Sequence, residues 1–171
     1  VNCESWANMA MNESFATYGE YIWIEHKYGL DAAQYNWQKD KNAYLREANV
    51  YQEELIRFHH KHREEMFDRH TYQKGGMILH ALRDYLGDNA FYEGLKHFLH
   101  EYEFEPVEAH QLRLSYEEVV GEDLNWFFNQ WFFNEGHAEL NIDHYYNDSL
   151  KLFVVEVEQV QDTVDKTFFK L

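Results

Sequence analysis

Proline and glycine are scarce in this chain, which has one proline and eight glycines among 171 residues. So few helix-breaking residues favour long helices over a turn-rich β architecture. The single cysteine, Cys3, excludes an internal disulfide bond and leaves the redox compartment open. No apolar run approaches the roughly twenty residues of a membrane-spanning helix, so we expect no membrane partner.

Positive charge is also in short supply. The chain has 15 lysines and arginines against 31 aspartates and glutamates, for a formal net charge of −16. A field of that sign repels phosphate backbones, so we expect no nucleic-acid partner. Hydrophobic residues make up 45% of the chain and aromatic residues 18%, which is enough for a packed core. The length fits one domain, or part of a domain and the start of another.

Helical spacing of apolar residues runs through most of the chain, so the predicted fold class is mainly α. The predicted helices cover residues 5–28, 31–58, 71–86, 88–99, 107–120 and 124–133. After Gly136-His137 the period changes to two, which predicts a β-hairpin that turns at Asn147-Asp148-Ser149, and a third strand at Phe168-Phe169. We therefore divide the chain into a helical part, 1–137, and a segment of antiparallel strands, 138–171.

Glu13 is the most informative residue of the first predicted helix. Its neighbours on the helix are largely apolar, among them Trp6, Phe15 and Ile22. A carboxylate among apolar side chains must be paired, hydrogen-bonded, protonated or bound to a metal, because its desolvation alone is too costly. The alternative is that Glu13 is an ordinary structural residue on the polar side of the helix.

Two stretches resemble the aminopeptidase N family of zinc metallopeptidases, the gluzincins. The run from Trp6 to Glu20 is similar to the family segment W-x-N-x-x-x-x-N-E-G-F-A-x-Y-x-E, with one residue fewer between Asn8 and Asn12 and with Ser14 where the family usually has glycine. The run from Phe67 to Gly76 looks like the family motif F-D-x-x-x-Y-x-K-G-x. The resemblance covers most of the chain, and both motifs stand in the family's order.

The resemblance implies roles for two residues. Glu13 falls on the family's third zinc ligand, and Tyr72 falls on its catalytic tyrosine. A phenol suits that role, since it can donate a hydrogen bond to a developing oxyanion without a full charge in the ground state. The alternative for Tyr72 is that it merely packs at the start of a helix.

The H-E-x-x-H helix that supplies the family's two zinc-binding histidines and its general base is not found in these residues. By the family's spacing it would end several residues before Val1. The nearest string, His100-Glu101-Tyr102-Glu103-Phe104, has a phenylalanine in place of the second histidine, and a phenylalanine cannot bind zinc. The family's G-x-M-E-N segment, which reads the free amine of the substrate, would also lie upstream.

These observations predict the helical C-terminal half of a thermolysin-like catalytic domain, followed by the first strands of a β-sandwich domain. The function that the resemblance implies is that of a fragment of a zinc aminopeptidase, which hydrolyses N-terminal residues from peptides. We expect this chain alone to be inactive and to hold no catalytic zinc tightly. Its expected partners are peptide substrates of the whole enzyme and the missing N-terminal half of the catalytic domain.

Apolar surface that the zinc helix would cover, near Trp6, Phe15 and the helix after Tyr72, predicts self-association. Two other functions stay open. One is a relative that has lost its metal motif and serves as a scaffold, and the other is a stand-alone acidic helical interaction module. The sequence His59-His60-Lys61-His62 favours a solvated loop over a metal site, because adjacent histidines seldom converge on one ion.

Overall fold

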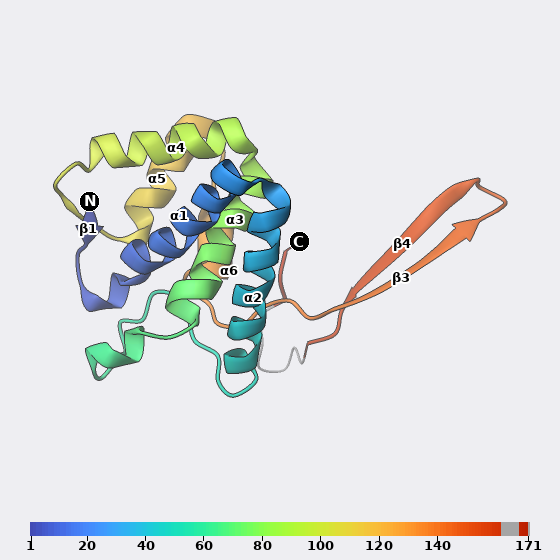
Figure 1. Ribbon diagram of the computed structural model, residues 1–171, viewed down its shortest axis with the longest axis horizontal. Coiled ribbons are helices and arrows are strands. Elements are labelled where there is room, and N and C mark those ends of the chain that lie inside the picture. The colour runs from blue at the N-terminus through green and yellow to red at the C-terminus, as the bar shows by residue number, and fades with distance from the viewer. Residues whose placement is uncertain (162–167, 171) are drawn as a thin grey trace.

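The computed structural model describes residues 1–161 and 168–170, and it shows a helical body from which a long hairpin projects (Figure 1). This architecture confirms the predicted fold class. The α-helices are α1 (Ala10–Tyr28), α2 (Leu30–Ala48), α3 (Gly75–Leu86), α4 (Asp88–Glu101), α5 (Ala109–Val120) and α6 (Asn125–Trp131). Three short helical turns are η1 (Trp6–Asn8), η2 (Arg63–Met66) and η3 (His70–Lys74).

Helix α1 lies at the centre of the body, where it packs against α2, α3 and η3. Gly29 ends α1 with a φ of 90°, a conformation that glycine adopts without strain, and α2 folds back from there. Arg83 of α3 then joins three helices, because its guanidinium bonds Glu25 of α1 at 2.7 Å and Asp88 of α4 at 2.8 Å. These contacts fix the direction of α1, on which Glu13 lies.

Helix α2 is shorter than its sequence predicts. The apolar pattern favours one helix as far as residue 58, but α2 ends at Ala48 and a segment of turns and irregular chain follows. Leu55 and Ile56 are buried there, and their backbone N–H groups donate to the Phe132 carbonyl at 3.1 Å each. Apolar residues after Ala48 therefore do not indicate a longer helix. They are apolar because this segment packs against the end of α6, and such packing buries side chains in an irregular segment as well as in a helix.

Two short strands tie the start of the chain to the connection between α4 and α5. Strand β1 (Asn2–Cys3) pairs in parallel with β2 (Pro106–Val107). The Glu4 N–H extends this pairing by donating to the Val107 carbonyl at 2.9 Å. The first turn of α1 is therefore anchored from the N-terminal side as well as through its helix contacts.

The predicted hairpin is confirmed. Strands β3 (Leu140–Asn147) and β4 (Leu152–Gln159) pair antiparallel, with Ile142 opposite Val157. The predicted third strand is wrong, because Phe168–Lys170 has no strand conformation. The sequence also predicts a turn near Gln161 to Asp165 before it, and residues 162–165 of that turn lie outside the described residues. Phe169 instead packs on α6, with its ring 4.8 Å from that of Trp131.

The change from helices to strands falls near the predicted boundary at 137/138, and a β-sandwich domain that begins there stays a prediction. None of the helices in the described part of the chain is both long enough and apolar enough to cross a membrane.

Candidate active site

Glu13 and Tyr72 come from two elements that lie against each other. Glu13 is in the first turn of α1, and Tyr72 is in η3, a π-helical turn that runs directly into α3. Both side chains are half-buried. Single π-helical turns occur frequently at functional sites, because they displace side chains from the regular helical positions.

The structure brings the two predicted site residues together. Partial burial raises the pKa of Tyr72, and the Glu13 carboxylate raises it further through its negative charge and a hydrogen bond with the phenol. Tyr72 is therefore protonated near neutral pH and able to donate a hydrogen bond. A stand-alone module in which the two residues are unrelated predicts the opposite arrangement, with the side chains apart.

The two motifs contact each other next to Glu13 and Tyr72, through Ser14 of the first motif. Ser14 is buried and its hydroxyl donates to the Thr71 carbonyl at 2.8 Å. Across the contact is Gly75, where an added Cβ would lie 1.8 Å from the Ser14 Oγ. Ser14 thus fits where it does because Gly75 has no side chain. The hydrogen bond also satisfies one backbone carbonyl of η3, the turn that carries Tyr72.

A buried ion pair anchors the residues just before Tyr72. Arg57 bonds both oxygens of Asp68, at 2.7 and 2.9 Å, and also reaches the Thr71 hydroxyl at 2.8 Å. Burial opposes ionisation of Asp68, but the Arg57 guanidinium and the Thr71 N–H together hold the pKa of that carboxyl below its ordinary value. Such charge-assisted bidentate pairs define geometry closely.

Lys74, the lysine of the second motif, is buried within the body. Its ammonium group donates to the Glu53 carbonyl at 3.1 Å. Burial lowers the pKa of Lys74 to about 8, although the Glu54 carboxylate acts in the opposite direction. The lysine therefore ties η3 to the irregular segment after α2, which gives it a structural role in this chain.

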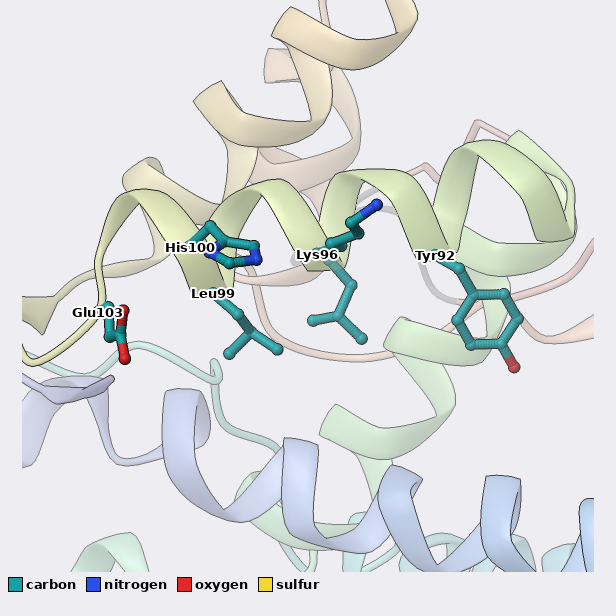
Figure 2. Close-up of a pocket in the computed structure, with 6 residues that line it drawn as sticks. Tyr92, Lys96, Leu99, His100 and Glu103 are labelled. Carbon is teal, nitrogen blue, oxygen red and sulfur yellow. The ribbon is translucent and has the colours of Figure 1, made fainter.

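The Tyr72 ring borders a surface hollow of about 460 Å³, whose other lining residues are Glu47, Phe67, Asp68, Arg69 and Gln73. Another hollow, of about 370 Å³, is lined by α4 and the residues just after it (Figure 2). It contains His100 and Glu103 of the string that most nearly matches H-E-x-x-H, but neither predicted site residue. Phe104, at the place of the second histidine, is 91% exposed.

Glu13 is one carboxylate ligand of the kind that zinc accepts, and a catalytic zinc needs three protein ligands. Within residues 1–161 and 168–170, Glu13 belongs to no group of three converging histidine, cysteine, aspartate or glutamate side chains. The residues present therefore fit part of a zinc site.

The apolar patch predicted near Trp6, Phe15 and the helix after Tyr72 is present only in part. Trp6 and Phe67 are 42% and 50% exposed, and their rings lie 6.1 Å apart. Phe15, expected in the same patch, instead stacks on Phe98 at 6.3 Å. Helix α3 is largely buried, because it packs against both α1 and α4. The patch is therefore limited to the start of the chain and the turn before η3.

Residues 1–131 match the family described as the peptidase family M1 domain. The chain belongs to this family. The match spans both motifs and all six α-helices, and it ends before the hairpin. In this M1 domain Ser14, the residue that departs from the first motif, bonds Thr71 across the contact between α1 and η3.

The similar proteins are aminopeptidases of the same family. Probable aminopeptidase 1 of Sulfurisphaera tokodaii is 27% identical over 90% of this chain and 20% of its own length. Aminopeptidase N of Lactococcus lactis is 28% identical over 99% of this chain and 19% of its own length. The M1 chain described here therefore spans about a fifth of the length of these relatives.

Two solved structures resemble the fold. An M1 zinc metallopeptidase of Deinococcus radiodurans, an E323A mutant bound to a Tyr-Ser-Ala substrate, has a TM-score of 0.61 and 29% identity over 75% of this chain and 28% of its own. Aminopeptidase A of Legionella pneumophila, in complex with aspartic acid, has a TM-score of 0.74 over 93% of this chain and 18% of its own. At 19% identity the second likeness concerns the fold alone.

The sequence motifs do not identify the residues that bond around η3, the turn that carries Tyr72. Arg57 has no motif around it, and only Asp68, the acidic residue of the second motif, hinted that a basic partner would be needed. Ser14 departs from the family pattern in sequence. Its hydroxyl can bond Thr71 because Gly75, which is distant in sequence, has no side chain in the way. The histidine loop is solvated as predicted, with His59 and His62 exposed.

Proposed function

We propose that this chain contributes Glu13 and Tyr72 to the active site of a zinc aminopeptidase that removes N-terminal residues from peptides. The observation that carries the proposal is that α1 packs on η3, which brings Glu13 close enough for its carboxylate to raise the pKa of the Tyr72 phenol. Its further support is the match of residues 1–131 to the M1 domain. The two zinc-binding histidines and the general base would come from polypeptide outside these 171 residues.

Each of the two residues has a defined task in this proposal. Glu13 would supply one oxygen ligand to zinc, an ion that polarises a peptide carbonyl and activates water when bound. Tyr72 would donate its phenolic proton in a hydrogen bond to the carbonyl oxygen as that atom becomes negative. The donor is useful because the hydrogen bond strengthens as charge develops on the oxygen.

Hydrogen bonds to the neighbouring residue restrain the position of Tyr72. The Arg57–Asp68 pair and the Ser14 hydroxyl both act on Thr71, the residue next to Tyr72. They limit movement of the backbone that carries the phenol, and positioning within a fraction of an ångström matters for oxyanion stabilisation. Ser14, Arg57 and Asp68 are therefore positioning residues in this proposal.

The test uses a polypeptide in which an H-E-x-x-H segment precedes this chain. Tyr72→Phe should lower kcat by about 10²- to 10³-fold, as loss of an oxyanion donor does, while KM changes little. Tyr85→Phe is the matched control, since Tyr85 is a surface residue that bonds Glu122. An unchanged kcat in Tyr72→Phe would contradict the assignment.

The chain alone is proposed to be inactive, since one carboxylate does not make a catalytic zinc site. Aminopeptidase turnover by the purified 171-residue chain would refute this. The exposed pair of Trp6 and Phe67, together with the exposed apolar residues of the hairpin, is proposed to promote self-association. Light scattering that shows only monomer at high concentration would contradict that part.

A further inference from the structure

A second group of potential metal ligands lies beside Tyr72 and apart from Glu13. It consists of Glu47 at the end of α2, Asp68 before η3, and His70 in η3. One ligand atom from each lies within 4.8 Å of the others. We propose that these three residues form a binding site for zinc or another divalent transition metal, separate from the proposed catalytic zinc site.

The histidine is the observation that distinguishes this group from an ordinary acidic cluster. His70 is 0% exposed, and neither of its ring nitrogens has a hydrogen-bond partner in the described part of the chain. Leaving a buried polar atom unpaired costs about 1–3 kcal/mol, so such atoms usually have a partner. The Nδ1 atom faces the acidic side chains, 3.3 Å from Glu47 Oε1 and 3.7 Å from Asp68 Oδ2.

Those separations fit a shared ion. Zinc binds imidazole nitrogen at about 2.0–2.1 Å and carboxylate oxygen at about 2.0–2.2 Å, so two ligands at a tetrahedral angle lie roughly 3.3–3.5 Å apart. Both distances from His70 Nδ1 are close to this range. One nitrogen and two oxygens favour zinc, cobalt or nickel over calcium and magnesium, which prefer oxygen ligands alone.

The position also allows an ion to enter. Glu47 and Asp68 both line the hollow of about 460 Å³ beside Tyr72, and the Glu47 side chain is 24% exposed. His70 does not line the hollow, and the rings of Tyr44 and Tyr51 lie 5.3 and 5.2 Å from its own. An ion in the hollow therefore meets the two carboxylates directly.

Arg57 limits the affinity without removing the site. Its guanidinium uses one lone pair on each oxygen of Asp68, and the Thr71 N–H uses the second on Oδ1. Oδ2, the oxygen nearest His70 Nδ1, keeps a second lone pair for an ion. The positive charge of Arg57 repels a cation, however, so we expect weaker binding than at a structural zinc site with thiolate ligands. The other candidate group, Glu53, Glu54 and His59, lacks a buried ligand, since the His59 side chain is 64% exposed.

The experiment titrates zinc chloride into the 171-residue chain and measures stoichiometry and affinity by isothermal calorimetry. The expected result is one zinc ion per chain, bound at least tenfold more weakly by Glu47→Gln and by His70→Gln. Glu47→Gln keeps an acceptor for the Arg69 N–H, which bonds Glu47 at 2.6 Å, so this variant should fold even where His70→Gln does not. Zinc should also shift the His70 imidazole nitrogen signals in NMR spectra, and calcium should not.

Two control variants separate this site from its rivals. Glu13→Gln tests the proposed catalytic ligand, and Glu53→Gln tests the exposed group with His59. Both should bind zinc as the unchanged chain does. The proposal is overturned if zinc affinity falls in either control and not in Glu47→Gln, or if the unchanged chain binds no zinc at about 1 mM.

Discussion

The helical body and the hairpin differ in how their side chains are held. Around η3, buried polar groups such as Ser14, Arg57 and Lys74 each bond a particular partner, and Gly75 leaves room for one of them. In the hairpin, strand pairing fixes the register, yet Ile142, Val155 and Val157 are all exposed. Tertiary bonds between buried side chains therefore specify the geometry between motifs, whereas backbone pairing and contacts among exposed side chains specify the hairpin.

The largest expected effect comes from breaking the buried ion pair. Arg57→Met leaves the Asp68 carboxylate buried without its counter-charge, which should lower the free energy of unfolding by about 3–5 kcal/mol. Chemical denaturation measures it. Arg63→Met is the matched control, because the Arg63–Glu64 pair is 63% and 71% exposed and its loss should have little effect on stability. Equal losses in both variants would contradict the importance of the buried pair.

A smaller effect is expected at the contact between the motifs. Gly75→Ala places a methyl group against Ser14 and should cost about 1–3 kcal/mol through overpacking. In a Ser14→Gly background the same substitution should cost much less, because the opposing side chain is gone. A double-mutant cycle by chemical denaturation measures this coupling. Additive effects would show that the two residues are not in contact.

The smallest effect is expected in the hairpin. Ile142 is 57% exposed, so Ile142→Ser should change the free energy of unfolding of the helical body by less than about 0.5 kcal/mol. The denaturation midpoint followed by helical circular dichroism measures it. A loss as large as that of Gly75→Ala would show that the hairpin supports the body, and the contrast between the two regions would fail.

The sequence was sufficient for the helices and the hairpin, because apolar periodicity and turn residues are local signals. Gly29 and Gly87 mark helix ends in the structure where the sequence places them. The end of α2 was not predictable, since it depends on the distant Phe132 carbonyl that accepts from Leu55 and Ile56. The spacing of apolar residues along the chain carries no information about such a long-range hydrogen bond.

The candidate site was predictable in part. Two motifs pointed to Glu13 and Tyr72, and the structure places them in contact. The Glu47, Asp68 and His70 group was missed because Glu47 is on another helix and has no motif around it. Of the histidines in the 59–62 stretch, His59 and His62 are exposed and His60 is half-buried. The buried histidine beside two carboxylates, His70, is the one histidine of the second motif.

The most direct test of the account is the pKa of Tyr72 in the 171-residue chain, followed by NMR of labelled tyrosines and assigned with Tyr72→Phe. Partial burial and the Glu13 carboxylate both raise this pKa above its ordinary value. Glu13→Gln removes the negative charge, so the Tyr72 pKa should fall toward the ordinary value, while that of Tyr85, which bonds Glu122, stays unchanged. A Tyr72 pKa that is the same with and without the Glu13 charge would contradict the claim that these residues share one site.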